Sequence, residues 1–467
     1  MKRSRTSTSW VQPENVTHPT GRKSVREPWK VVIVGGGFGG LCAAQGLKSR
    51  SVDVTLIDCH NYHLFQPLLY QVATGSLSPG EIAAPLRSIL SHQKNTTVLL
   101  GTVVDVDPVL KRVLLADGVS LPYDSLIVAA GSQSSYFGHE NWREWAPGLK
   151  SIEEATHIRH KILYAFEVAE RIADPVQRRN WLRFVIVGAG PTGVELAGAI
   201  GEIARQTLKN DFRSIHPEDA QIVVVDFAPR VLMPFPENLA HKAERSLAKL
   251  GVHIKCGALV KDVNQDGLTI EIGGQIERLC ARTVIWAGGI SGSPLGNVLA
   301  SRTKAKTDKA GRVRVQPDLT VPGYPDIYVV GDLASTVDAS GKPLPGLAQV
   351  ALQGGAYAAK AILRKLNGQA ALPPFRYLDK GSLAVIGRAS AVANVFGFQI
   401  WGLPAWLVWV LIHLMYLVQF QNRLLVLIQW AIQDLTFSRG ARLITGSAVS
   451  DFDFNKEMAR EDNARTS

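Results

Sequence analysis

The stretch VVIVGGGFGGLCAAQGL, residues Val31–Leu47, decides the fold of the first part of the chain. Residues 30–34 read as a short buried strand, and residues 41–49 read as a helix. Between them lies a G-x-G-x-x-G pattern at Gly35, Gly37 and Gly40. In this pattern the first glycine permits a tight turn, the second lets the backbone approach a pyrophosphate, and the third lets helix and strand pack closely.

An acidic residue completes this first unit. Asp58 ends the next apolar strand, residues 53–58, and lies 18 residues after Gly40. A carboxylate at this position can accept hydrogen bonds from ribose hydroxyls. Because strand, turn, helix and acid agree, the sequence predicts a dinucleotide site here, with phosphates at the helix N-terminus.

A second stretch of the same kind is FVIVGAGPTGVELAG, residues Phe184–Gly198. It carries Gly188, Gly190 and Gly193 in the same pattern, and Asp226 lies at the end of the following strand, residues 221–227. A carboxylate there favours a free 2′-hydroxyl and repels a 2′-phosphate, so NADH is expected over NADPH. The neighbouring Arg230 is a cation that could instead bind a 2′-phosphate, which would favour NADPH.

The two units form an approximate internal repeat. Apolar strands ending in glycine turns recur at residues 125–132 and 283–289, each about 95 residues after its glycine-turn strand. A charged helical stretch, residues 151–182, separates the two units, and a further strand ends at Gly331–Asp332. The expected fold class is α/β, with two Rossmann-like dinucleotide-binding domains.

Two dinucleotide sites in one chain suggest that electrons pass between them. One cofactor would stay bound while the other arrives as a substrate. Asp332 follows an apolar strand, and a carboxylate there can accept a hydrogen bond from the ribityl chain of a flavin. The alternative role for Asp332 is to cap the next helix.

Composition limits the remaining functions. The 467 residues are 46% hydrophobic and 19% charged, which is typical of a folded chain. The net charge of +11 comes without any nucleic-acid-binding motif, so no nucleic acid partner is expected. Cys42, Cys59, Cys256 and Cys280 form no C-x-x-C pair, so neither a disulfide framework nor a thiolate metal site is expected.

The C-terminal part carries no Lys, Arg, Asp or Glu from residue 389 to residue 422. Residues 405–420 predict a helix of about 16 residues, and a second apolar run follows Arg423. Tryptophans at positions 401, 406, 409 and 430 favour two short helices that lie in a membrane interface. A spanning helix and a dimer-forming core helix remain as alternatives.

Several longer motifs resemble the type II NADH:quinone oxidoreductases, the non-proton-pumping NADH dehydrogenases among the flavoproteins with two dinucleotide-binding domains. The resemblance covers about residues 30–446. Its motifs are NYHLFQPLLYQVATGSLSPGEIAAPLR (61–87), GAGPTGVELAG (188–198), VIWAGG (284–289), VVGD (329–332), AQVALQGG (348–355), DKGSLAVIGR (379–388) and HLMYLVQFQNRLLVLIQW (413–430).

This resemblance implies cofactors, partners and a place in the cell. FAD would be held non-covalently at the first glycine turn, and NADH would bind as a substrate at the second. A membrane quinone would take the electrons, without proton pumping. The protein would lie peripherally on the cytoplasmic face of the cell inner membrane, in contact with the bilayer surface, and could form a homodimer.

The resemblance also assigns roles to single residues. Glu195 would lie near the nicotinamide–flavin stack, and Gln349 and Gln353 would line the quinone pocket, although both amides could instead bond only backbone groups. Lys380 would offset negative charge on the reduced flavin, or else form a surface salt bridge. His63 is a candidate acid or base, but a hydrogen-bonded loop residue is the simpler reading.

The implied domain organisation is a disordered basic tail (1–29), a first FAD-binding part (30–150), an NADH-binding domain (151–295), a second FAD-binding part with the quinone-site segment (296–390) and an amphipathic membrane anchor (391–467). Two other functions stay open. A sulfide:quinone reductase of the same fold would need redox cysteines beside the flavin, and a redox-sensing regulator would bind flavin and NADH and dock a protein partner.

Overall fold

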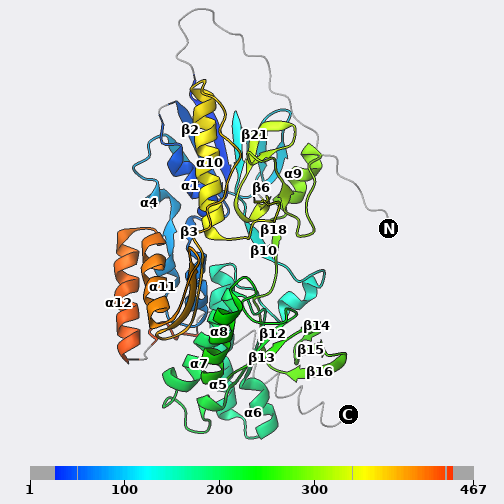
Figure 1. Cartoon of the computed structure of the whole chain (residues 1–467), viewed down its shortest axis with the longest axis vertical. Helices are drawn as coiled ribbons and strands as arrows, with labels where there is room; N and C mark the ends of the chain where they lie inside the picture. Colours follow the sequence, from blue (N-terminus) through cyan, green and yellow to red (C-terminus); the bar gives the residue numbers. More distant parts are fainter. Residues whose placement is uncertain (1–26, 50, 339, 437–438, 445–467) are drawn as a thin grey trace, which may run out of the picture.

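The computed structural model describes residues 27–49, 51–338, 340–436 and 439–444. Two α/β units follow one another along the long axis of the molecule (Figure 1). The first unit contains a six-stranded sheet in the order β20-β21-β9-β1-β2-β5. Its strands are β1 (Trp29–Val34), β2 (Val52–Asp58), β5 (Thr96–Leu100), β9 (Ser125–Val128), β20 (Thr320–Val321) and β21 (Tyr324–Val329).

The second unit repeats the central part of the first. Its four-stranded sheet has the order β13-β12-β11-β17, and β11 lies between β12 and β17 as β1 lies between β2 and β9. The strands are β11 (Arg183–Val187), β12 (Gln221–Asp226), β13 (Val252–Cys256) and β17 (Thr283–Trp286). All pairings in this sheet are parallel.

The repeat extends to a three-stranded antiparallel sheet in each unit. One consists of β6 (Val103–Asp107), β7 (Arg112–Leu115) and β8 (Ser120–Pro122) and precedes β9; the other consists of β14 (Ala258–Asn264), β15 (Gly267–Ile272) and β16 (Gln275–Cys280) and precedes β17. The chain crosses between the units twice. The crossings, β10 (Ser132–Ser134) and β18 (Ile290–Gly292), pair with each other antiparallel. The predicted internal repeat is therefore confirmed.

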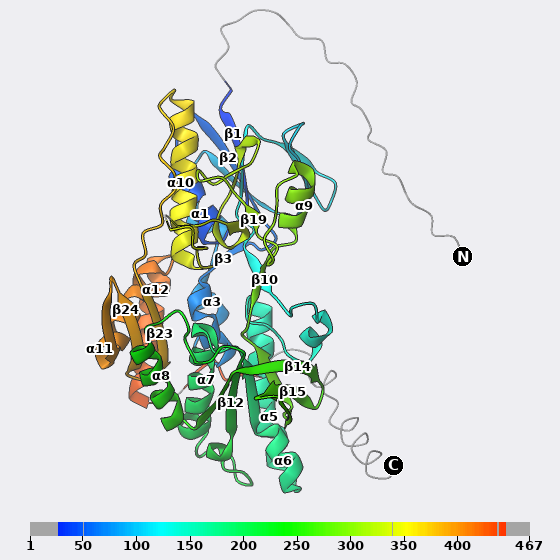
Figure 2. The ribbon, with the colours of Figure 1, turned by 45° about the vertical axis from the view of Figure 1, so that its right-hand side comes forward.

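The first unit is closed by a helix from the second half of the chain. Helix α1 (Phe38–Gly46) packs against α10 (Ala348–Leu366), and Figure 2 shows the two side by side. A Cβ on Gly355 would lie 2.1 Å from the carbonyl oxygen of Gly39, so only glycine permits this approach. The strand β21, which pairs with β9, also comes from this late segment.

The expected helix over residues 151–182 is divided in two. Helix α5 (Ile152–Arg171) ends before Ile172, and α6 (Pro175–Trp181) begins at a proline. Proline disfavours a helical conformation in the residue before it. Asp174 instead caps α6, its side chain accepting a hydrogen bond from the backbone N–H of Val176 at 3.0 Å.

A third layer lies beside the second unit. The sheet of β23 (Ser382–Gly387), β24 (Ser390–Val395) and β25 (Phe398–Gly402) packs with α7 (Pro191–Glu202) and α8 (Glu237–Lys249) on one side. Helices α11 (Leu403–Tyr416) and α12 (Phe420–Thr436) lie outside it, at the left of Figure 1. The remaining helices and strands are α2 (Leu69–Ala73), α3 (Pro79–Ile82), α4 (Leu86–Ile89), α9 (Leu295–Thr303), β3 (Tyr62–Leu64), β4 (Ala83–Pro85), β19 (Val313–Arg314) and β22 (Ala334–Ser335).

The two C-terminal helices are present as predicted, but their boundary is not where the sequence suggested. The break falls at residues 417–419, before Arg423, and Gln419 has a φ of +69°. Arg423 lies inside α12 and donates from Nε to the carbonyl oxygen of Leu417 at 2.7 Å. The basic residue therefore caps the end of α11 rather than interrupting the helical run. Among the described residues, no helix combines the length and the apolar character needed to cross a bilayer.

The expected basic tail (1–29) and the expected membrane anchor (391–467) lie partly outside the described residues.

Candidate active site

The first glycine turn has the geometry of a phosphate cradle. Gly35 has a φ of +105°, and a Cβ on Gly40 would lie 1.8 Å from the carbonyl oxygen of Gly35. Around Gly37 a Cβ would meet nothing within 4 Å, so the backbone there faces open space. Helix α1 starts at Phe38 and presents its unpaired N–H groups to that space.

The second turn is the same structure. Gly188 has a φ of +111°, a Cβ on Gly193 would lie 1.8 Å from the carbonyl oxygen of Gly188, and Gly190 faces open space. Helix α7 starts at Pro191, where the missing N–H of proline costs no hydrogen bond. Both turns therefore fit a pyrophosphate in the same way.

The two acids hold these turns in place. Asp58 accepts hydrogen bonds from the backbone N–H of Gly36 at 2.5 Å and of His60 at 2.6 Å. Asp226 accepts the equivalent bonds from Ala189 at 2.5 Å and from Ala228 at 2.7 Å. Carboxylate oxygens have more than one acceptor position, so each acid can also accept from a ribose hydroxyl.

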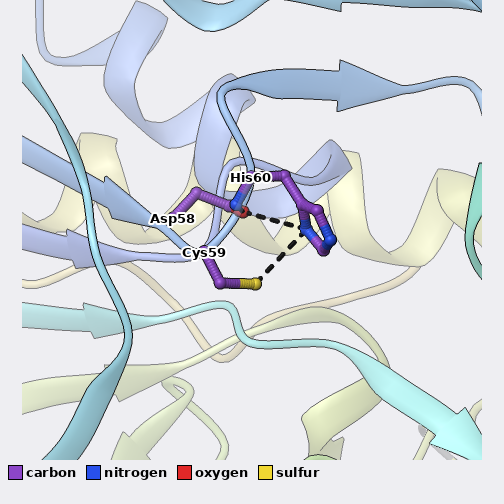
Figure 3. Close-up of side chains that lie close together, drawn as sticks. All are labelled: Asp58, Cys59 and His60. Atoms are coloured by element: carbon purple, nitrogen blue, oxygen red, sulfur yellow. Dashed lines mark hydrogen bonds and ion pairs between the residues drawn. The ribbon is translucent and has the colours of Figure 1, made fainter. Parts of the chain in front are cut away.

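Asp58 also belongs to a group of three potential metal ligands, drawn in Figure 3 with Cys59 and His60. Cys59 Sγ lies 3.3 Å from His60 Nδ1, which lies 3.5 Å from Asp58. Burial and the adjacent Asp58 raise the pKa of the Cys59 thiol, which disfavours the thiolate that a metal needs. Since Asp58 already anchors the glycine turn, we assign this group to the dinucleotide site and not to a metal.

His63 is a buried residue beside the first turn. Its Nδ1 lies 2.9 Å from the carbonyl oxygen of Gly36, which matches the simpler of its two expected roles. Its Nε2 is buried and has no hydrogen-bond partner among the described residues. Burial lowers the pKa of the His63 imidazole, so the ring is neutral near pH 7. An orphaned ring nitrogen at this place fits a site that a polar cofactor completes.

Asp332 does not cap a helix. It lies inside the short 3₁₀ turn Gly331–Leu333, whose cap position is Val330. Its carboxylate instead accepts a hydrogen bond from Ser132 Oγ at 2.7 Å. Gly331 has a φ of +70°, and this turn brings the carboxylate to the crossing strand β10.

The two units meet at a cavity of about 90 Å³, here called the junction cavity. It brings together residues from the first unit, the connection between the units and the second glycine turn. Its lining is Gln66, Pro67, Leu69, Tyr70, Leu149, Lys150, Thr192 and Glu195. Two dinucleotides bound at the two turns would have their reactive ends near such a junction.

Glu195 lies on α7 and also borders a second cavity of about 100 Å³, here called the outer cavity. That cavity reaches Trp406, Trp409 and Trp430 of the C-terminal helices and Arg439 beyond them. Burial raises the pKa of the Glu195 carboxyl to about 8, and the backbone N–H of Val385, 3.4 Å away, lowers it only in part. This carboxyl therefore carries a proton at neutral pH.

The protonation of Glu195 predicts a pH-dependent stability. Its pKa rises from 4.5 in the unfolded chain to about 8 in the folded one. The folded state therefore binds more protons between these values, and the free energy of unfolding falls as pH rises from about 4.5 to about 8. In Glu195→Gln this contribution is absent. The thermal unfolding midpoint of the variant should therefore rise relative to that of the parent as the pH increases from 5 to 9. A constant difference across this range would contradict the assignment.

Gln349 and Gln353 lie four residues apart on α10, so they share one face of this helix, and both bond to backbone groups. Gln349 donates to the carbonyl oxygen of Gly381 at 3.0 Å and accepts from the N–H of Lys380 at 3.3 Å. Gln353 donates to the carbonyl oxygen of Leu378 at 3.0 Å and accepts from its N–H at 2.9 Å. The two amides thus hold the segment 378–381 on the helix that closes the first unit.

Lys380 reaches the C-terminal helices. Its Nζ donates to the hydroxyl of Tyr416 at 2.9 Å and lies 5.6 Å from the ring centroid. The side chain forms no salt bridge to a described carboxylate. Lys380 is exposed and lines neither cavity.

Sequence reasoning missed three residues of this region. Lys150 lies directly before the helix cap Ser151, Tyr416 ends α11, and Arg439 follows α12. None of them belongs to a motif that signals a cofactor. The four cysteines line neither cavity, and burial raises the pKa of Cys256 to about 11. No cysteine is thus placed for the sulfide:quinone alternative.

Comparisons with known proteins show the family of this chain. Residues 29–355 match the family described as pyridine nucleotide-disulphide oxidoreductase, and residues 380–439 match the NDH2 C-terminal domain. The type II NADH:quinone oxidoreductase Ndh of Mycobacterium tuberculosis is 47% identical over 422 residues, which cover 89% of this chain and 90% of that protein. A type II NADH:quinone oxidoreductase of Staphylococcus haemolyticus is 31% identical over 80% of this chain and 92% of its own.

Solved structures show the same fold. NDH2 from Plasmodium falciparum in complex with NADH has a TM-score of 0.82 at 21% identity, covering 90% of this chain and 100% of that one. The sulfide:quinone oxidoreductase of Aquifex aeolicus has a TM-score of 0.69 at 18% identity, covering 85% and 91%. The fold alone does not separate these two activities, but the sequence identity over nearly the whole chain does. The chain belongs to the type II NADH:quinone oxidoreductases, within the pyridine nucleotide-disulphide oxidoreductase family.

Proposed function

We propose that this flavoenzyme, an NADH:quinone oxidoreductase, uses its two similar glycine turns for two different nucleotides. FAD would stay at the turn of Gly35, Gly37 and Gly40, where α10 closes the site and Asp58, His63 and Asp332 offer polar groups. NADH would enter at the turn of Gly188, Gly190 and Gly193. When bound, FAD supplies the redox chemistry, taking a hydride from NADH and giving two electrons to quinone.

The observation that carries this proposal is the junction cavity. It is lined by Thr192 of the second turn and by Lys150, which lies beside Asp332 of the first unit. Reactive ends of two nucleotides would meet there, and the surrounding chain would keep water away from the transfer. Glu195 faces the same space with a protonated carboxyl, so it can hold a proton beside the nicotinamide without adding a negative charge.

We further propose that Asp226 selects NADH over NADPH. Its two oxygens already accept two backbone N–H groups, which fixes the carboxylate in place. A 2′-phosphate at the same position would face this fixed negative charge. Arg230, which could have favoured the phosphate, donates instead to backbone carbonyls of residues 231–235.

The quinone site that we propose is formed by Gln349, Gln353 and Lys380. The two amides fix the segment 378–381 against α10, and Lys380 bonds Tyr416 at the end of α11. Each amide has one N–H and one acceptor position beyond these bonds and can therefore bond a quinone carbonyl. The segment thus connects the flavin unit with the helices that would lie in lipid.

Exposed apolar side chains on α11 and α12 support a contact with the bilayer surface. On α11 they recur every four residues, and on α12 they cover a similar stripe. The exposed residues are Leu403, Leu407, Leu411, Met415, Tyr416, Phe420, Leu424, Leu425, Leu427, Ile428 and Ile432. The opposite face of α12 is fixed to the protein, for example by Trp430 Nε1 donating to Gln71 Oε1 at 2.8 Å.

This surface gives a prediction on membrane binding. Leu411→Asp and Ile428→Asp replace side chains that are 60% and 47% exposed. Each should weaken binding to lipid vesicles roughly tenfold, because burying a leucine-sized side chain contributes about 1.5–3 kcal/mol. Vesicle co-sedimentation measures the partition. The matched control is Val109→Asp, 81% exposed in the first unit, which should bind like the parent protein. Equal loss in all three variants would contradict the proposed surface.

The function itself is tested by two half-reactions. We expect the detergent-purified protein to be yellow, to bleach on anaerobic addition of NADH, and to recover its colour on addition of a soluble quinone. A preparation that bleaches but never recovers would support a redox-sensing regulator instead.

The mass of the protein in detergent tests the homodimer. Protease access in oriented membrane vesicles tests the expected cytoplasmic face of the inner membrane.

A further inference from the structure

The backbone N–H and the backbone carbonyl oxygen of Lys150 each form a hydrogen bond with a side chain. Its N–H donates to Glu154 Oε2 at 2.7 Å, and its carbonyl oxygen accepts from Gln66 Nε2 at 3.3 Å. The next residue, Ser151, caps α5 and accepts from the N–H of Glu154 at 3.1 Å. The start of helix α5 and a residue of the first unit therefore set the position of Lys150 together.

The ammonium group of Lys150 is also held in place. Its Nζ donates to Ser132 Oγ at 3.3 Å, and Ser132 Oγ donates to Asp332 Oδ2 at 2.7 Å. The distance from Lys150 Nζ to this carboxylate oxygen is 4.0 Å, and the side chain is 25% exposed. Ser132 and Lys150 are 18 residues apart, and the third member of this hydrogen-bonded chain, Asp332, lies 200 residues after Ser132.

This ammonium is placed where charge would change during turnover. Lys150 is the one cationic residue among those that line the junction cavity, as far as the described residues show. Glu195, which lines the same cavity, is protonated at neutral pH, so Asp332, 4.0 Å from the ammonium, is the carboxylate that faces this charge. A fixed positive charge in a partly dry site acts more strongly than the same charge in water.

We propose that Lys150, positioned by Ser132 and Asp332, is the cation that raises the reduction potential of the bound flavin, in place of Lys380. The reason is geometric: the Lys150 ammonium belongs to the junction cavity, whereas the Lys380 ammonium is exposed and bonds Tyr416. A nearby cation favours the form of the cofactor that has gained negative charge. The inference rests on the FAD site proposed above and adds a role for Lys150 there.

The midpoint potential of the flavin tests this inference. It is measured on purified, FAD-loaded protein by anaerobic titration against a reference dye. We expect Lys150→Met to make reduction at least tenfold less favourable, which is a fall of about 30 mV for a two-electron couple. Lys150→Arg keeps the charge, so its equilibrium constant for flavin reduction should stay within threefold of that of the parent. Lys380→Met and Lys360→Met, which replace exposed lysines, should leave the potential unchanged.

Two results would overturn the inference: an unchanged potential in Lys150→Met, or an equal fall in Lys380→Met. If Lys150→Met does not retain FAD, Ser132→Ala removes the link between Lys150 and Asp332 and keeps both charges. Ser132→Ala should then make reduction of the flavin measurably less favourable, but by less than tenfold, which is a fall in midpoint potential of less than about 30 mV. An unchanged potential would again overturn the inference. These outcomes are independent of the function proposed above, because that would fail already in the parent protein.

Discussion

Replacing Gly37 by alanine is expected to give a folded protein that purifies without its yellow cofactor. A Cβ at this position meets no protein atom within 4 Å, so the fold itself has room for it. The space that it would enter lies in front of the N-terminus of α1, where the pyrophosphate of FAD would approach the backbone. Absorbance near the flavin bands and the thermal unfolding midpoint measure the two effects separately.

Gly40→Ala should act differently, which makes the pair informative. Its Cβ would lie 1.8 Å from the carbonyl oxygen of Gly35, so α1 would have to move away from β1. We expect loss of both the cofactor and the folded state. Gly80→Ala is the control, since a Cβ there also meets nothing within 4 Å and Gly80 lies in neither glycine turn. A yellow Gly37→Ala protein with full flavin content would refute the proposed cradle.

Arg439→Met is expected to lower the free energy of unfolding by up to about 3 kcal/mol, the lower end of the cost of breaking a buried pair, because the Glu202 side chain left unpaired is 22% exposed. Arg439 is 8% exposed, donates from Nη2 to Glu202 Oε2 at 2.9 Å and from Nη1 to the carbonyl oxygen of Thr74 at 3.2 Å. Glu202 ends helix α7, so this contact ties the chain beyond α12 to the helix that carries Glu195. Denaturant unfolding of the FAD-loaded protein measures the change.

Two further variants separate charge from packing in this prediction. Glu202→Gln combined with Arg439→Met leaves no unpaired charge, and the glutamine oxygen can still accept from the N–H of Arg388, as Glu202 does. The double variant should therefore be more stable than Arg439→Met alone. Arg442→Met breaks a more exposed pair with Asp211 and should cost less than about 1 kcal/mol. Equal losses for Arg439 and Arg442 would contradict the buried-pair interpretation.

The sequence alone predicted those parts of the fold that depend on neighbouring residues in the chain. Gly40 and Gly193 each approach the carbonyl oxygen of the glycine five residues earlier, and Gly35 and Gly188 have positive φ angles. These constraints give the G-x-G-x-x-G pattern, which could be identified from the sequence alone. Buried parallel strands are continuous apolar runs, and β12 therefore begins where it was predicted, at residue 221. The resemblance to a known family supplied the cofactor and quinone roles, which no local pattern contains.

The sequence was not sufficient where partners lie far apart. Lys150, Ser132 and Asp332 meet only after both crossings between the units have formed, and no spacing rule connects them. Arg439 finds Glu202 across 237 residues. The break between α11 and α12 is also a tertiary effect, since Gln419 takes a left-handed conformation and bonds Ser88 Oγ at 3.0 Å.

The closure of α1 by α10 has a consequence for biosynthesis. The Gly39 backbone meets Gly355, so a nascent chain cannot complete the packing around the first glycine turn, the proposed FAD site, until residue 355 has left the ribosome. At the usual 5–20 residues per second, the remaining 315 or so residues take roughly 15–60 s. During this time the half-built sheet lacks β21 and β20, so β9 is an edge strand with unpaired backbone groups. If FAD binds at this turn as proposed, it would therefore be inserted after residue 355 has been synthesised and not during early translation.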